Sequence, residues 1–596
     1  MENKYSARLQ SLRDYMRSAG VAATIIPQTD PHQSEYLSAH WQVRRWLSGF
    51  TGSAGDLLVT LDGALLWADS RYWLQAARQL EGTGIEVMED GKPETPSMID
   101  YICGNLPAGS TVGIDGMLFS INTTRTMESR LEAAGMKLVV DFNPIDLVWT
   151  DRPGRPDSKV FVHEEKYAGM SASDKIDMVL DRVKTSGAVS AFISDLAEIA
   201  WILNIRGADV SCNPVVTSFL YLSSQGGVLF IDEDKVNDDV RRHLEAASVT
   251  LKPYDAILGF LSALPSEEKV LVSASQSAGA LMAALGARAV VGASPAAMLK
   301  AVKNDVQLSG VRDAMVRDGV ALVHSFMEIE DMIAQGKPLT EMGVAEILRR
   351  HRSADPMFFD LSFETIAGYG AHGAIVHYDP TPETDVEVRP GNLLLVDSGA
   401  NYFDGTTDIT RTISIGEPSN AQRHDFTLVM KGHISIATAI YPEGTRGAQL
   451  DVLARINLWK EGLSYLHGTG HGVGHFLNVH EGPQSIRLND TMAPLVPGMI
   501  TSNEPGLYRE GEYGIRCENL VLTAEAFATG FGRFYKFETL TLFPFDLTLF
   551  DTSIMTDEEI DWVNAYHAMV CERLLPNLDA KAQQWLLSKT SVLTRK

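Results

Sequence analysis

The sequence predicts an α/β protein that begins with two related domains, each containing a mixed sheet. Residues 7–26 and 174–193 share one pattern, in which a helix is followed by a glycine and an apolar strand. Residues 63–69 (GALLWAD) and 226–232 (GGVLFID) form a second matching pair. Alternating helices and strands are typical of α/β domains. Because 596 residues exceed what one hydrophobic core usually serves, we expect three domains.

The first predicted element is an amphipathic helix over residues 1–20 (MENKYSARLQSLRDYMRSAG). It lacks the apolar core of a signal peptide. Along the whole chain, no apolar run approaches the roughly 20 residues that cross a membrane. These observations predict a cytoplasmic protein that does not bind membranes.

Two further regions set the expected domain boundaries. Residues 150–159 (TDRPGRPDSK) are rich in proline, glycine and charge, which indicates a linker. A long helix is expected through residues 300–333. Near the C-terminus, Thr556 and Glu559 have capping-box spacing and predict another helix. The expected domains are 1–155, 156–307 and 308–596.

Composition excludes some functions. The formal net charge of −25 argues against binding nucleic acid through a basic surface. The four cysteines are widely spread and form no CxxC pair, which predicts reduced thiols rather than a disulfide framework. These cysteines are Cys103, Cys212, Cys517 and Cys571.

Histidines are most concentrated in residues 467–483 (HGTGHGVGHFLNVHEGP), which contain His467, His471, His475 and His480. Imidazole binds metals, donates hydrogen bonds and moves protons near neutral pH. The intervening glycines disfavour a regular helix. Taken alone, the segment fits either a metal site or a polar surface loop.

Upstream, two aspartates lie beside predicted strands. Residues 393–396 are apolar and indicate a buried strand that ends at Asp397. A second strand is expected over 409–415, directly after Asp408 and beyond a hairpin that contains glycine. Both acids are therefore expected at the ends of neighbouring strands. Ordinary turn aspartates are the alternative, since Asp favours turns.

Downstream, Glu504 follows an apolar stretch and precedes a Pro-Gly pair. Residues 513–523 (YGIRCENLVLT) alternate like a strand, and a period of two places Arg516 and Glu518 on one face. Burying those charges is costly unless they are paired or bound to a metal. A simple Arg–Glu surface pair on an edge strand is the alternative.

Together these segments give four carboxylates and one imidazole: Asp397, Asp408, His471, Glu504 and Glu518. Such ligands suit divalent Mn, Co, Fe or Zn. Their combined negative charge balances two dications, which favours a two-metal site.

This ordered set, within LLLVDSGA, GTTDITRT, HGTGHGVG, SNEPG and IRCEN, resembles the metal ligands of the pita-bread metallopeptidases. The segments NVHEGP and GAIVHYDP (373–380) are similar to those of aminopeptidase P. Residues 31–55 and 67–76 resemble the long, three-domain form of that family. The resemblance implies two creatinase-like N-terminal domains and a pita-bread catalytic domain.

The resemblance also implies a role for each ligand. Asp397 would hold one metal ion, His471 and Glu504 would hold the other, and Asp408 and Glu518 would bridge them. A water between the ions would attack the peptide bond. Glu504 is expected, in addition, to pass the proton of that water toward the leaving proline nitrogen.

Other residues are expected to line or support the site by resemblance. His377, His467 and His480 would bind substrate and stabilise the tetrahedral intermediate. Arg516 would hold Glu518 or a nearby tyrosine in place. Arg71 would reach the active site of a partner subunit, with an ordinary surface arginine as the alternative.

The implied function is removal of the N-terminal residue from peptides with proline at the second position, by a cytoplasmic homodimer. Two Mn²⁺ ions are the expected cofactors, and the ligands also suit Co²⁺ or Zn²⁺. A prolidase acting on Xaa-Pro dipeptides is one alternative. A non-catalytic pita-bread module that binds peptides or histones is another, disfavoured, as is a creatinase-like hydrolase, because all five ligands are present. His475 matches no recurring histidine, and we expect it to pack.

Overall fold

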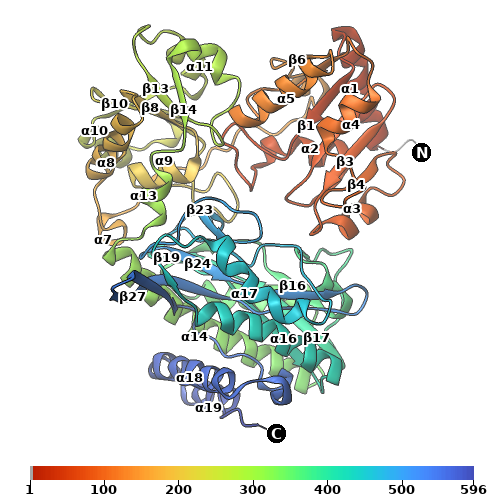
Figure 1. Ribbon diagram of the computed structural model, residues 1–596, viewed down its shortest axis with the longest axis vertical. Coiled ribbons are helices and arrows are strands. Elements are labelled where there is room, and N and C mark those ends of the chain that lie inside the picture. The colour runs from red at the N-terminus through yellow and green to blue at the C-terminus, as the bar shows by residue number, and fades with distance from the viewer. Residues whose placement is uncertain (1–3, 596) are drawn as a thin grey trace. The chain divides into compact units, whose positions relative to one another are not determined.

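The chain folds into two compact units in the computed structural model, which describes residues 4–595 (Figure 1). Unit 1 contains the residues up to Glu165 and Met170–Leu299. Unit 2 contains Lys166–Gly169 and the residues from Lys300 onward. Across residues 4–595, none of the helices has the length and apolar character needed to cross a membrane.

The first part of unit 1 is a six-stranded mixed sheet with the order β4-β3-β2-β1-β5-β6. Its strands are β1 (Ala23–Ile26), β2 (Asp56–Thr60), β3 (Ala64–Ala68), β4 (Glu86–Glu89), β5 (Thr111–Gly113) and β6 (Lys137–Val139). The helices around it are α1 (Lys4–Ala19), α2 (Val43–Ser48), α3 (Trp73–Gln79), α4 (Met98–Asn105), α5 (Ile121–Ala133) and α6 (Ile145–Val148).

The second part of unit 1 contains another six-stranded sheet, with the order β12-β11-β10-β8-β13-β14. Its strands are β8 (Ser190–Ile193), β10 (Phe219–Ser223), β11 (Gly226–Phe230), β12 (Val249–Lys252), β13 (Val270–Ser273) and β14 (Ala289–Gly292). The associated helices are α8 (Ala172–Thr185), α9 (Leu196–Leu203), α10 (Asp238–Ala246), α11 (Ile257–Ser262) and α12 (Leu281–Leu285). The short strands β7 (Phe161–Val162) and β9 (Ile205–Arg206) pair separately.

The two sheets have the same topology, which confirms the predicted internal repeat. In each, the first strand pairs antiparallel with one neighbour and parallel with the other. The remaining pairs also match in direction. Gly20 and Gly187, which separate helix from strand in the two copies, both have positive φ angles, 68° and 80°. Glycine adopts this left-handed conformation without steric cost and so ends each helix.

Unit 2 is built on the 30-residue helix α14 (Asp305–Ala334), which follows α7 (Glu165–Ala168) and α13 (Ala297–Ala301) in the chain. Asn304 and Gln307 form a capping box at its N-terminus. The helix therefore begins at Asp305 and not at the predicted residue 300, because reciprocal capping satisfies its free amide groups there. The predicted C-terminal helix is confirmed as α18 (Asp557–Leu574), with Thr556 and Glu559 in a capping box.

The sheets of unit 2 carry the acidic and histidine-rich segments. A three-stranded sheet has the order β16-β17-β20, and a six-stranded sheet has the order β21-β28-β27-β24-β22-β23. Smaller sheets are β15-β18-β19 and β25-β26. The strands are β15 (Phe358–Leu361), β16 (Ile366–Tyr369), β17 (Asn392–Ser398), β18 (Ala400–Tyr402), β19 (Gly405–Thr406), β20 (Ile409–Ile415), β21 (Ile440–Pro442), β22 (Gly470–Gly472), β23 (Glu481–Ile486), β24 (Ile500–Asn503), β25 (Gly506–Arg509), β26 (Tyr513–Arg516), β27 (Asn519–Thr529) and β28 (Gly532–Thr539).

Helices border these sheets and share one apolar core with them (Figure 1). Besides α14 and α18, they are α15 (Glu341–Arg352), α16 (Asn420–Ala437), α17 (Gly447–Trp459) and α19 (Ala580–Lys589). The core includes Phe326 of α14, Phe426 of α16 and Leu394 of β17, all at most 2% exposed. The functional segments thus lie on strands that a large core holds rigid.

Candidate functional site

Two acids come from adjacent strands of the three-stranded sheet, as the sequence predicts. Asp397 is in β17, where it lies opposite Thr410 of the antiparallel strand β20. Asp408 directly precedes β20. The connection between the strands is more elaborate than the predicted hairpin, since it contains β18 and β19. A Cβ at Gly399 would lie 2.0 Å from the Thr407 carbonyl oxygen, so only glycine fits this crossing.

Three further residues come from the six-stranded sheet. His471 is in β22, which pairs with β24. Glu504 directly follows β24 and Glu518 directly precedes β27. These strands pair antiparallel, with Asn503 opposite Asn519, so both glutamates leave the sheet at the same edge.

The predicted continuous strand over 513–523 is wrong. Strand β26 ends at Arg516, and β27 begins at Asn519. Between them, the Glu518 amide donates to the Thr410 carbonyl at 3.1 Å, and the Thr410 hydroxyl donates to Glu518 Oε2 at 2.9 Å. Residues 513–523 therefore do not form one alternating strand, because Glu518 bonds to β20 of the three-stranded sheet.

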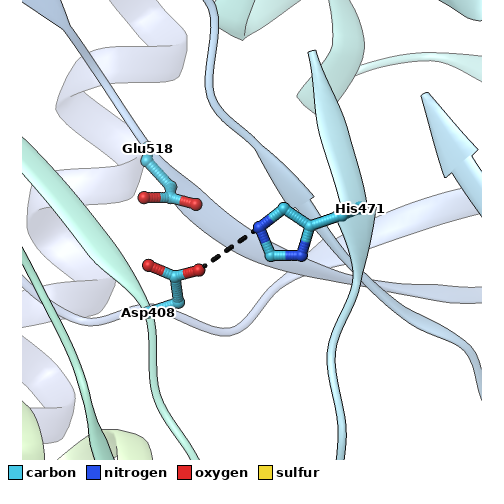
Figure 2. A group of neighbouring side chains, drawn as sticks. All are labelled: Asp408, His471 and Glu518. Carbon is cyan, nitrogen blue, oxygen red and sulfur yellow. Dashed lines mark ion pairs between the residues drawn. The ribbon is translucent and has the colours of Figure 1, made fainter. Parts of the chain in front are cut away.

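The five predicted ligands are linked by short distances. Single ligand atoms of Asp408, His471 and Glu518 all lie within 4.8 Å of one another, and Figure 2 shows the three side chains converging. His471 Nε2 is 3.4 Å from Asp408 Oδ2 and 3.6 Å from Glu504 Oε1. Asp397 is connected to the group through Arg516, which also bonds to the Thr410 hydroxyl that holds Glu518.

Burial makes this concentration of negative charge costly without a cation. It raises the pKa of the Asp397, Glu504 and Glu518 carboxyl groups, and the neighbouring acids raise them further. Burial alone would lower the pKa of the His471 imidazole, but its hydrogen bond to Asp408 and the charge of Glu504 raise it to about 9.

Two observations show that these residues fit metal ions. Among the described residues, Asp397 Oδ1 and Glu518 Oε1 are buried without a hydrogen-bond donor. A buried carboxylate oxygen requires a compensating partner, and a cation provides one. In addition, His471 Nδ1 lies 2.9 Å from the Gly472 carbonyl oxygen, so a ring that gives up one proton to bind a cation keeps the other on Nδ1. That tautomer leaves the Nε2 lone pair facing the acids, as metal ligation requires.

Arg516 balances part of the charge, and of its two expected partners, Glu518 or a nearby tyrosine, it contacts the tyrosine. Its guanidinium, 2% exposed, donates to Asp397 Oδ2 at 2.7 Å rather than to Glu518. It also donates to the Tyr508 hydroxyl at 2.8 Å, and that hydroxyl lies 2.8 Å from His467 Nε2. The His467 Nδ1 is 2.7 Å from the Gly468 carbonyl, so Nδ1 donates and Nε2 accepts the tyrosine proton. One chain of hydrogen bonds therefore joins Asp397 to His467.

The other predicted histidines lie in distinct settings. The His480 ring lies edge-on to His471, with centroids 4.4 Å apart. His377 is half-buried and precedes Tyr378, whose hydroxyl donates to the buried Glu341 at 2.8 Å. His475, for which we expected a packing role, is 2% exposed.

Sequence reasoning missed a buried ion pair on α17. Arg455 bonds to Asp451, and it also donates to the His467 carbonyl at 2.8 Å. The Thr469 hydroxyl donates to Asp451 as well. The one available signal was the i,i+4 spacing of an acid and an arginine, which is common on exposed helices and does not mark a site.

Arg71 belongs to unit 1. Its Nε and Nη2 donate to the two oxygens of Asp69, at 2.9 Å and 2.7 Å. The side chain is 26% exposed. Its expected reach into a partner subunit stays a prediction.

Comparisons with known proteins agree with this geometry. Two models described as Creatinase/Prolidase N-terminal domain match residues 8–148 and 151–307. Metallopeptidase family M24 matches residues 309–525, and its C-terminal region matches 533–593. The chain is 40% identical to aminopeptidase P2 of Arabidopsis thaliana over 99% of this chain and 88% of that protein.

A probable Xaa-Pro aminopeptidase P of Laccaria bicolor is 39% identical over 98% of this chain and 93% of its own length. Among solved structures, the X-prolyl aminopeptidase of Caenorhabditis elegans superposes with a TM-score of 0.95 at 34% identity, covering 99% of both chains. That protein is described as a cytosolic enzyme with a di-nuclear active site.

Proposed function

The chain belongs to metallopeptidase family M24, with the Xaa-Pro aminopeptidases as full-length relatives, and we propose that it removes N-terminal residues that precede proline. The observation that carries this proposal is a buried centre at which His471 meets three carboxylates from two sheets, with a fourth, Asp397, connected through Arg516. Proline has no amide hydrogen and a fixed φ, so a bond before proline calls for a dedicated site.

The proposed cofactors are two divalent cations, with Mn²⁺ preferred and Co²⁺ or Zn²⁺ compatible with the same ligands. Asp397 would hold one ion, His471 and Glu504 the other, and Asp408 and Glu518 both. When bound, such ions make water acidic and polarise the carbonyl of the bond to be broken. The carboxylate oxygens without donors and the tautomer of His471 support this assignment.

Glu504 is the proposed proton carrier. Burial raises the pKa of its carboxyl group, which favours uptake of a proton by this side chain. One carboxylate oxygen takes the proton from the attacking water and then delivers it to the leaving proline nitrogen. The Ser502 hydroxyl, 3.4 Å from Glu504 Oε1, orients the carboxylate.

Three histidines are the proposed substrate contacts: His377, His467 and His480. The ring contact between His480 and His471 supports this role for His480. The two ring nitrogens of His467 are engaged by Gly468 and Tyr508. We therefore expect His467 and Tyr508 to act together, with Arg516 fixing the tyrosine from the other side. A hydrogen bond donated to the substrate by one of the three histidines would stabilise the developing oxyanion of acyl transfer.

The deciding experiment removes metal with a chelator, restores each divalent ion in turn and measures hydrolysis of an Arg-Pro-Pro peptide and of an Xaa-Pro dipeptide. We expect the tripeptide to be cleaved between its first two residues, fastest with Mn²⁺. Cleavage of the dipeptide alone would identify a prolidase. Absence of bound metal together with absence of turnover on any ion would indicate a binding module.

Three accompanying proposals concern the whole molecule. The family-model boundaries at 8–148, 151–307 and 309–525 support three domains, 1–155, 156–307 and 308–596. The cytosolic description of the nematode relative supports a cytoplasmic location. A homodimer, in which Arg71 approaches the partner's active site, follows from the resemblance and is tested by sedimentation of the metal-loaded protein.

A further inference from the structure

A second buried ionic group lies beside the candidate centre and provides none of its ligands. The Lys300 ammonium donates to Glu481 Oε2, and the Lys303 ammonium donates to Glu481 Oε1. The side chains of Lys303 and Glu481 are each 1% exposed, and that of Lys300 is 7% exposed. We call this the Lys300–Glu481–Lys303 cluster.

The cluster joins segments that are 178 residues apart or more in the sequence. Its lysines flank the residues where the chain enters unit 2, since unit 1 ends at Leu299. The Lys303 amide also donates to the Gly498 carbonyl at 2.9 Å, and Val302 forms a β-bridge with Met499. Residues 300–303 are therefore fixed to the start of β24, the strand that leads to Glu504.

Glu481 is the residue directly after His480. It begins β23 and lies opposite Gly472 of β22, so its backbone is paired beside His471. Val479, on the other side of His480, is 0% exposed. His480 is thus held between two buried residues, with its ring against His471. A shift of Glu481 would move His480 relative to the candidate metal ligands.

Stability alone does not account for this arrangement. Taking two ammonium groups and one carboxylate out of water is costly, and burial lowers the pKa of Lys303. Buried ion pairs are often no more stabilising than apolar residues of similar size, because desolvation offsets their attraction. Their best supported benefit is to specify one geometry.

We infer that the Lys300–Glu481–Lys303 cluster positions His480 for catalysis, with Glu481 as a positioning residue that acts through that histidine. This inference rests on the proposed function. Glu481 does not touch substrate in this scheme. It fixes the backbone that carries His480, and the two lysines fix Glu481 against the first residues of unit 2.

The test is a double-mutant cycle of Glu481→Gln and His480→Ala in the full-length, metal-loaded protein. Partners that orient catalytic groups are typically worth 10- to 100-fold, and we expect Glu481→Gln to lower kcat/KM by about that factor. Bound metal should stay at the wild-type level. In the His480→Ala background, Glu481→Gln should cost less than about 2-fold more, because both changes remove the same contribution. Glu481→Asp, which keeps the carboxylate, should recover part of the activity.

A matched control is Asp209→Asn in unit 1, which breaks another fully buried pair, Lys235–Asp209. It should lower the unfolding temperature without changing kcat/KM measured well below that temperature. If Glu481→Gln does not fold, Lys300→Met replaces it in the same cycle. It leaves the Lys303–Glu481 pair intact and should give a smaller, equally non-additive loss.

The outcomes separate the two proposals. Wild-type protein that cleaves no Xaa-Pro bond would remove the proposed function, and this inference with it. Active wild type with additive losses in the cycle, or with loss of metal in Glu481→Gln, would overturn only the inference. Wild-type kcat/KM in Glu481→Gln would do the same.

Discussion

Replacing Arg455 by methionine should strongly destabilise unit 2, because it leaves the buried Asp451 carboxylate without its cationic partner. Arg455 bonds to Asp451 through Nε at 2.6 Å and Nη2 at 3.2 Å, and the two side chains are at most 1% exposed. It also donates to the carbonyls of Tyr465 and His467. Methionine keeps the apolar length of the side chain but none of these donors.

The expected loss of unfolding free energy follows from the contacts that Asp451 keeps. In Arg455→Met, Asp451 keeps the Thr469 hydroxyl as a side-chain donor. Removing one partner of a buried ion pair typically costs about 3–5 kcal/mol. A loss of about 4 kcal/mol changes the unfolding equilibrium by roughly a thousandfold. The double variant Asp451→Asn/Arg455→Met should lose less than Arg455→Met alone, because it leaves no unpaired charge.

The assay is urea unfolding of the metal-loaded protein, followed by circular dichroism and by loss of activity. Arg533→Met is the control, because the Arg533–Glu525 pair spans 3.7 Å with both side chains more than 60% exposed. Such pairs contribute at most about 1 kcal/mol. Equal losses in Arg455→Met and Arg533→Met, or a double variant weaker than Arg455→Met, would refute the reasoning. Because Arg455 holds the His467 carbonyl, kcat/KM should also fall, by about 10-fold.

Four further predictions address catalysis, metal binding and pH. Glu504→Gln should abolish turnover, measured on an Arg-Pro-Pro peptide with Mn²⁺ present, and near-normal rates would remove its role as proton carrier. Thr410→Val keeps every proposed metal ligand but removes the hydroxyl that donates to Glu518 Oε2. The affinity for Mn²⁺, measured by titration, should weaken by about 10- to 100-fold. An unchanged affinity would contradict a supporting role for Thr410. Arg71→Ala should alter cleavage of long or short Xaa-Pro peptides, whereas unchanged kinetics for both would indicate an ordinary surface arginine. Burial lowers the pKa of Lys175 from 10.5 to about 7, so between these values the unfolded chain binds more protons and this group makes stability rise with pH. Lys175→Met should remove this pH-dependent gain in stability. The free energy of unfolding of the wild type, relative to that of the variant, should therefore increase between pH 7 and 9. An equal difference in unfolding free energy at both pH values would exclude the lowered pKa of Lys175.

The sequence predicts the ligand-bearing strands well where local patterns decide the structure. Asp397 ends an apolar run, and Asp408 precedes an alternating one, and the structure places both acids at adjacent strands. The internal repeat is also visible locally, because helix, glycine and strand follow one another within 20 residues in both copies. Such features depend on neighbours in the chain and need no knowledge of the fold.

Long-range pairing explains what could not be predicted. Arg516 and Glu518 alternate as on one strand, yet Glu518 bonds to Thr410 of another sheet, and Arg516 pairs with Asp397. Tertiary contacts override strand propensity at such positions. Lys300 and Lys303 fall at the start of the helix expected over 300–333, but both bury their charges against Glu481, far away in sequence. A single sequence carries no signal for such a partner.

The hydrogen bonds around the candidate metal centre orient the residues proposed as its ligands. Asp397 Oδ2 is held by Arg516 and Glu518 Oε2 by Thr410, while the other oxygen of each carboxylate is buried and has no donor among the described residues. His471 is fixed in the same way by the Gly472 carbonyl near Nδ1, so Nε2 is the ring nitrogen that faces the acids. When a hydrogen bond fixes one polar atom of a ligand side chain and the second polar atom faces the centre, less side-chain entropy is lost when a dication binds. The same bonds connect the centre to His467, one of the proposed substrate contacts, through Arg516 and Tyr508. Changes at these supporting residues should therefore affect metal affinity and turnover together, although none of them is a ligand.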